Sequence, residues 1–158
     1  MKNTNIILKH KLTQGLYKRL DEFELKRIYC IHNISHSLDV ARICYILNLE
    51  NGLGIDKDLI YSTAILHDLG RVYEYENKKD HNIASVDIAK EILEATDFSK
   101  DDKEIIIDAI KNHRNNDQSD RFNKIFYKAD KLSRDCFNCR SQDSCKWSRD
   151  KMNLELVY

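Results

Sequence analysis

The strongest constraint on the fold is a histidine–aspartate pair at the end of an apolar run. Ile60, Ala64 and His67 lie at positions i, i+4 and i+7, so on a helix the imidazole continues an apolar stripe that faces the core. Asp68 follows directly, and Gly70 is expected to be the residue at which the helix ends. A buried histidine beside a buried aspartate is costly unless each side chain has a partner.

The composition predicts an all-α protein. The chain has 158 residues, no proline, four glycines and 33% charged residues, which favours helices joined by short polar turns within one domain. Lysine plus arginine and aspartate plus glutamate number 26 each, so no global charge attracts nucleic acid or an anionic membrane as a partner. No apolar run of about 18 residues and no signal peptide are present, so we expect a cytoplasmic protein.

The apolar periodicity predicts a compact bundle of about six helices. Asp56 and Ser99 are expected to cap two of them, and residues 71–80 are expected to form a loop. Residues 1–15 are expected to be a polar, loose lead-in, residues 16–135 the helical domain, and residues 136–158 a short cysteine-rich extension. The expected helices span about residues 16–30, 36–49, 56–68, 81–95, 99–113 and 119–134.

Four of these helices each carry one histidine in line with the apolar stripe, and two aspartates lie in similar apolar surroundings. The six residues are His36, His67, Asp68, His81, His113 and Asp130. Neutral imidazoles and carboxylates are ligands of first-row metals, and six ligands exceed what one open catalytic metal takes. The set therefore predicts two metals, with Asp68 as the bridge. His32, four residues before His36, could share the same helix face.

Three short motifs resemble those of the HD superfamily of metal-dependent phosphohydrolases. They are HSLDVAR at residues 36–42, AILHDLG at residues 64–70 and KADKL at residues 128–132. The resemblance implies an all-helical domain with a metal at its centre and hydrolysis of phosphate esters, often of nucleotides. His81 and His113 match the positions that complete a second metal in dinuclear members of that superfamily.

The resemblance also implies a mechanism, in which a metal-activated water attacks a small phosphorylated substrate and Asp68 is the catalytic carboxylate. Arg71, Lys131 and Arg134 are the expected phosphate-binding residues, and Arg71 stands where cyclic-dinucleotide phosphodiesterases of the superfamily carry a lysine. The signature of those phosphodiesterases is absent, which disfavours that substrate. The ligand set suits one or two ions of Fe, Mn, Co, Ni or Zn.

Two other functions remain open at this point. Some members of the superfamily are di-iron oxygenases, which would depend on iron and oxygen. A non-catalytic, metal-binding interaction module would instead have a filled coordination shell and no turnover. The oligomeric state is equally open.

The cysteine-rich extension lies outside the HD pattern. Cys136 and Cys139 have the spacing of a two-thiolate clip, and Cys145 could add a third ligand for a zinc ion or an iron–sulfur cluster. The alternative is a set of reduced surface thiols or an adventitious disulfide. The residues open for a fourth ligand position are Asp143, Cys30 and Cys44, or a ligand from outside the chain.

Overall fold

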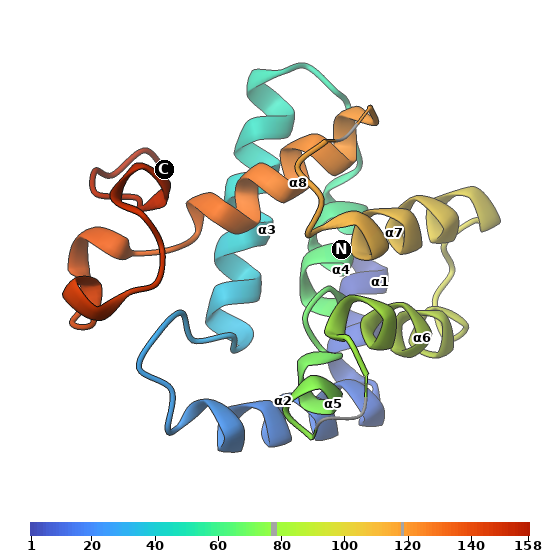
Figure 1. Ribbon diagram of the computed structural model, residues 1–158. Coiled ribbons are helices and arrows are strands. Elements are labelled where there is room, and N and C mark those ends of the chain that lie inside the picture. The colour runs from blue at the N-terminus through green and yellow to red at the C-terminus, as the bar shows by residue number, and fades with distance from the viewer. Residues whose placement is uncertain (77–78, 118) are drawn as a thin grey trace.

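The computed structural model describes residues 1–76, 79–117 and 119–158, and its regular structure in these ranges is entirely helical (Figure 1). This confirms the all-α prediction. Within the same ranges, no helix is long and apolar enough to cross a membrane. The helices are α1 Lys2–Lys9, α2 Lys11–Glu24, α3 Ile34–Glu50, α4 Lys57–Leu66, α5 Arg71–Tyr75, α6 His81–Leu93, α7 Lys100–Asn112 and α8 Arg121–Leu132, followed by short 3₁₀ turns η1 Cys136–Asn138, η2 Gln142–Ser144 and η3 Arg149–Lys151.

Helix α4 is the centre of the bundle. Every residue from 62 to 70 is buried, so this segment is enclosed on all sides rather than along one stripe. Helix α4 packs against α1, α3 and α7, and α3 packs in turn along α8 (Figure 1). The histidine–aspartate pair at the end of α4 therefore lies in the interior of the molecule.

The expected helix caps are confirmed. The Asp56 carboxylate accepts a hydrogen bond from the backbone N–H of Asp58 at the start of α4. At the start of α7, Ser99 and Asp102 form a reciprocal capping box. These contacts pair N–H groups that have no partner inside the helix, so they fix where each helix begins.

The N-terminal segment differs from the loose lead-in expected for residues 1–15. It forms α1 and the first part of α2, and Ile7 is fully buried. The Asp58 carboxylate accepts hydrogen bonds from the backbone N–H groups of Asn3 and Thr4 at 2.9 and 2.8 Å. This aspartate lies more than 50 residues away in the sequence, which is why the local polar composition hid the packing of α1.

Two of the expected element boundaries differ from those of the structure. The helix expected over residues 16–30 ends at Glu24, and the loop expected over residues 71–80 begins with the short helix α5. Residues 77–78 of that expected loop lie outside the described residues. Helix α5 matters for the site because it brings Glu74 beside the first residue of α6.

The structure shows a different reason for the glycine at position 70 from the one expected. Its φ of −68° is right-handed, so it does not end a helix in the left-handed conformation. A Cβ at this position would lie 2.2 Å from the His81 carbonyl oxygen and 2.4 Å from the Ser85 backbone nitrogen. The Gly70 N–H also donates to the Ser85 hydroxyl at 2.9 Å. The absent side chain therefore lets α6 approach the end of α4.

We predict that Gly70→Ala destabilises the protein by about 2–4 kcal/mol, because backbone atoms cannot give way as a flexible side chain can. Gly15→Ala, within α2 and with no heavy atom within 4 Å of its added Cβ, is the matched control and should stabilise the protein by about 0.5–1 kcal/mol. Denaturant unfolding monitored by circular dichroism measures both changes. Equal stability of the two variants would contradict this account of Gly70.

Candidate metal centre

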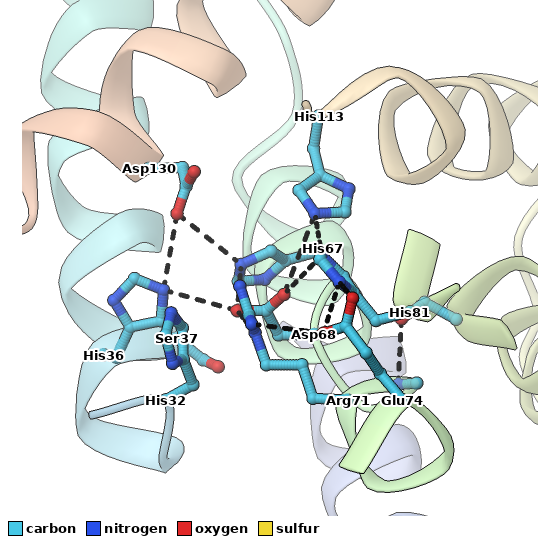
Figure 2. Close-up of polar contacts among 12 residues, drawn as sticks. His32, His36, Ser37, His67, Asp68, Arg71, Glu74, His81, His113 and Asp130 are labelled. Carbon is cyan, nitrogen blue, oxygen red and sulfur yellow. Dashed lines mark hydrogen bonds and ion pairs between the residues drawn. The ribbon is translucent and has the colours of Figure 1, made fainter. Parts of the chain in front are cut away.

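The structure brings the six predicted ligand residues together at the centre of the bundle, as Figure 2 shows. Two of them directly follow α4, and the other four come from the ends or end turns of α3, α6, α7 and α8, which surround the end of α4. His67 and His113 are the residues that follow α4 and α7, and His81 is the first residue of α6. Helix ends supply residues whose side chains can converge on one point while the helix bodies pack outside it.

The Asp68 carboxylate lies between two groups of histidines. Its Oδ2 atom is 3.3 Å from His67 Nε2 and 3.7 Å from His36 Nε2. Its Oδ1 atom is 3.6 Å from His81 Nε2 and 3.7 Å from His113 Nε2. One oxygen thus faces each histidine pair, which is the arrangement of a carboxylate that can bridge two ions.

Asp130 joins the first of these groups. Its Oδ1 atom lies 3.4 Å from His36 Nε2 and 4.0 Å from His67 Nε2. Both oxygens of Asp68 and the Nε2 atoms of His36 and His67 are buried without a hydrogen-bond partner. Buried polar groups without partners are costly, and a cation is the partner that satisfies imidazole nitrogens and carboxylate oxygens together.

Two of the histidines are oriented by the helix that precedes them. His67 Nδ1 lies 2.6 Å from the Ala64 carbonyl oxygen, and His113 Nδ1 lies 2.6 Å from the Ile110 carbonyl oxygen. A carbonyl only accepts, so Nδ1 must carry the proton in both residues. In the neutral form of each ring, the Nε2 atom then keeps its lone pair, which is directed into the centre.

The other two histidines are oriented by side chains. His81 Nδ1 lies 2.9 Å from both Glu74 carboxylate oxygens, and His36 Nδ1 shares a hydrogen bond with the Ser133 hydroxyl at 3.3 Å. A carboxylate behind a ligating histidine fixes the ring and makes it more basic. Sequence reasoning missed Glu74 because it falls within the segment expected to be a loop.

The electrostatics keep two of the histidines neutral. Burial lowers the pKa of His113 to about 3, and burial together with the Arg71 charge lowers the pKa of His81. His67 differs: burial lowers its pKa, but the charges of Asp68 and Asp130 outweigh burial and raise it. Neutral imidazole is the form that binds a metal ion, so His81 and His113 need release no proton to do so.

The two aspartates are held in the charged form. Burial acts to raise the pKa of Asp68, but the neighbouring charges of His67 and Arg71 hold it well below its usual range. Burial opposes ionisation of Asp130 in the same way, and its contact with His36 outweighs burial and keeps its pKa well below the usual range. The centre therefore contains two charged carboxylates at neutral pH.

A cavity of about 490 Å³ opens over this cluster, and cationic side chains gather around it. His81, His113 and Asp130 form part of its wall. Glu74 and Asp130 are the acidic residues that line it. The cationic residues that line it are Arg27, Arg71, Arg114, Lys131, Arg134 and Lys146.

The three predicted phosphate-binding residues all line this cavity. Arg71 Nε lies 2.9 Å from Asp68 Oδ2, although their alignment makes an ion pair and not a hydrogen bond. Lys131 forms an ion pair with its neighbour Asp130. The Arg134 guanidinium lies 3.8 Å from the centre of the Trp147 ring, and its buried Nη1 has no hydrogen-bond partner.

Sequence reasoning missed three of the cations, Arg27, Arg114 and Lys146, because no motif marks them. It left His32 open, and the structure places a ligand atom of His32 within 4.8 Å of ligand atoms of His36 and Asp68. The sequence signal for this contact was the position of His32, four residues before His36.

The cysteines of the extension lie beside the histidine cluster, and Cys145 also lines the cavity over it. Cys136, Cys139 and Cys145 are free thiols that line a second cavity together with Cys30. Cys44 is fully buried in the core.

We predict a pH dependence of stability for the metal-free protein. In the unfolded chain, His113 has a pKa of about 6.5, whereas in the folded protein its pKa is lowered to about 3. As the pH falls, the unfolded chain therefore takes up the proton first, which favours unfolding. The stability contributed by neutral His113 is therefore fully present above about pH 6.5 and is lost as the pH falls toward 3, by about 1.4 kcal/mol per pH unit. His113→Asn should show a shallower loss of unfolding free energy between about pH 6 and pH 4. Parallel curves for the two proteins would contradict this assignment.

Comparisons with known proteins agree with the fold. The family model for the HD domain matches residues 33–135. An uncharacterized protein of Clostridium beijerinckii is 45% identical over 148 residues, covering 92% of this chain and 94% of that protein. Ribonuclease Y of Acetivibrio thermocellus is 28% identical over 104 residues, which cover 66% of this chain but 18% of the ribonuclease.

A solved structure shares the fold. The crystal structure of a protein from an uncultured Thermotogales bacterium, described as a predicted HD superfamily hydrolase, aligns with a TM-score of 0.63 and 20% identity, over 89% of this chain and 81% of that chain. At this identity the likeness establishes the fold. With the family match over residues 33–135, it confirms the resemblance found in the three sequence motifs. The chain belongs to the HD domain family.

Proposed function

We propose that this protein is a metal-dependent phosphohydrolase that acts on a small phosphate ester, with nucleotides as the substrate class. The observation that carries the proposal is the buried Asp68 carboxylate, whose two unpartnered oxygens each face one histidine pair beneath a cation-lined cavity.

The donor set fits two metal ions. His36, His67 and Asp130 would hold one ion, His81 and His113 would hold the other, and Asp68 would bridge them. The oxygen and imidazole ligands suit Fe, Mn, Co, Ni or Zn. When bound, such ions polarise a phosphoryl oxygen and lower the pKa of a water molecule so that a nucleophile forms at neutral pH.

The cationic side chains would hold the substrate. Arg71 is fixed by Asp68 and Glu74, so its guanidinium is already directed at the cavity without free rotation. Lys131 and Arg134 line the same space. Several cations in a partly enclosed cavity offset the charge of more than one phosphate group, which favours a polyphosphate or nucleotide over an uncharged ester.

The aromatic lining supports a nucleotide. Tyr29, Tyr127 and Trp147 lie around the same cavity, and aromatic rings are surfaces on which a base can stack. The relation to ribonuclease Y makes an RNA phosphodiester a competing substrate. The 26 basic and 26 acidic residues give no net charge for a long nucleic acid, so we favour the small substrate.

The two other functions weighed from the sequence make different predictions. A non-catalytic metal module needs a closed coordination shell, whereas this cluster borders a cavity of about 490 Å³. A di-iron oxygenase would use the same ligand residues, and it would require oxygen and iron together. Hydrolysis in the absence of oxygen, with manganese or cobalt as the metal, separates the hydrolase from the oxygenase.

The direct test is hydrolysis of a substrate panel. The protein is freed of metal with a chelator and supplied in turn with Mn, Co, Fe(II), Ni, Zn or Mg. Each form is then incubated anaerobically with nucleoside mono-, di- and triphosphates, dinucleoside polyphosphates and a short RNA, and the products are separated by chromatography. Metal-dependent cleavage of a nucleotide supports the proposal. Cleavage of the RNA alone would replace the small substrate by a nucleic acid, and no cleavage by metal-loaded protein would overturn the hydrolase assignment.

We predict that Asp68→Asn lowers kcat by about 10²–10³-fold, because one carboxylate oxygen is lost from the position shared by both histidine pairs. Asp87→Asn is the matched control, since this carboxylate is largely exposed on α6 and pairs with Lys79 at the surface. Steady-state hydrolysis of the best substrate measures both variants. Full activity of Asp68→Asn would remove the carboxylate from the mechanism.

We also predict that Arg71→Gln raises KM by about 10-fold or more, because a charged contact to phosphate is lost. Arg42→Gln is the control, since Arg42 pairs with Asp39 on the exposed face of α3 and does not line this cavity. An unchanged KM for Arg71→Gln with a lowered kcat would mean that Arg71 positions Asp68 and does not bind the substrate.

A further inference from the structure

Four of the five cysteines surround one cavity beside the candidate active site. Cys30, Cys136, Cys139 and Cys145 all line a space of about 360 Å³, and all four are free thiols. Cys30 comes from the segment between α2 and α3, whereas the other three belong to the C-terminal extension. The structure thus places Cys30, one of the residues open for the fourth ligand position, on the same cavity as the other three cysteines.

The extension has no hydrophobic core of its own. None of the residues from 136 to 158 is buried, and its regular structure is three short 3₁₀ turns. Figure 1 shows this segment, in red, at one side of the bundle beyond the end of α8. A short segment that buries so little apolar surface normally needs a disulfide or a structural metal to hold one conformation.

Two observations tie Cys30 to the extension. The Tyr29 hydroxyl donates a hydrogen bond to the Ser144 carbonyl oxygen at 3.0 Å, so the residues adjacent to Cys30 and Cys145 are in contact across 115 positions of sequence. Cys30 also has a φ of +30°, the one positive φ found outside glycine among the described residues. A cysteine pays a steric cost for this conformation, and such strain persists where the surroundings require the side chain to point in one direction.

The turns of the extension arrange the remaining thiols. The Cys139 N–H donates to the Cys136 carbonyl at 3.2 Å, and the Cys145 N–H donates to the Gln142 carbonyl at 3.2 Å. The Gln142 side chain closes the loop by donating to the Cys136 carbonyl at 2.7 Å. Two cysteines separated by two residues in a tight turn form the usual half of a tetrathiolate zinc site.

We propose that Cys30, Cys136, Cys139 and Cys145 bind one structural zinc ion that fastens the C-terminal extension to the helical domain. Four thiolates form the closed, tetrahedral set that structural zinc prefers. No cysteine sulfur in the described part of the chain belongs to a group of ligand atoms within 4.8 Å of one another, so the ion would draw the four sulfurs inward. The segment from residue 136 to residue 145 can follow, because none of its residues is buried. The contacts that hold the extension to α8 and α3 lie further along the chain, at Asn153 and Tyr158.

The zinc ion would also shape the mouth of the candidate active site. Lys146 and Trp147 directly follow Cys145 and line the cavity over the histidine cluster. Trp147 in turn packs against the Arg134 guanidinium. Fixing Cys145 would therefore fix one wall of that cavity, although the zinc site itself does not depend on the proposed hydrolase activity.

The test measures the zinc content of the parent protein and of variants that each lack one proposed ligand. The full chain and its Cys30→Ser, Cys136→Ser, Cys139→Ser and Cys145→Ser variants are purified with zinc, and bound metal is measured per chain. We expect each variant to contain one zinc ion fewer than the parent protein. Cys44→Ala is the matched control, because Cys44 lies in the core away from the cavity, and it should keep the parent's zinc content.

Cobalt substitution of the parent protein gives a second readout that needs no mutation. Cobalt bound by thiolates shows a sulfur-to-metal charge-transfer absorption in the near ultraviolet, which histidine and carboxylate ligands cannot produce. We expect this band in the parent and in Cys44→Ala, and its loss in Cys30→Ser. The proposal is overturned if the parent protein lacks the band, if the four thiols are found in disulfides, or if the protein as purified contains iron with acid-labile sulfide. Unchanged zinc in Cys30→Ser would likewise overturn the four-cysteine assignment.

Discussion

The structure depends on the burial of one carboxylate. Asp68 is 3% exposed, and neither of its oxygens has a hydrogen-bond partner in the protein. A charge in that position is tolerable only when complementary groups surround it. The bundle meets this condition by directing the ends of α3, α4, α6, α7 and α8 toward the same point, so the packing of the helices and the assembly of the candidate metal centre are one arrangement.

The carbonyl group at the end of a helix orients two of the candidate ligands. His67 and His113 each follow the last residue of a helix, and each donates from Nδ1 to the carbonyl three residues earlier. Carbonyls in the last turn of a helix have no partner within that helix, so the imidazole satisfies one of them while its Nε2 atom faces inward. The end of a helix thereby determines the tautomer of each of these two histidines. His81 begins a helix, where no such carbonyl is free, and Glu74 of α5 takes that role.

Positive charge is concentrated around the candidate metal centre. The sequence as a whole has no net charge, yet six lysines and arginines line the cavity over the histidine cluster. They come from the segment after α2, from α5, from the end of α7, from the end of α8 and from the extension. The total charge bears on the binding of a long nucleic acid, but it does not show which small ligand this cavity can take, because charge acts at short range through the surfaces that face one another.

The sequence by itself determined the helices that carry a clear apolar stripe, the caps at Asp56 and Ser99, and the six residues that meet at the centre, because periodicity and motifs are properties of neighbouring residues. Only the tertiary structure decided that α1 packs onto α4 and that Glu74 supports a histidine. It also decided that Gly70 is needed for the approach of α6 and that Cys30 joins the thiols of the extension. These contacts join residues brought together by folding from different segments, and no local pattern in a single sequence records which distant segments will meet.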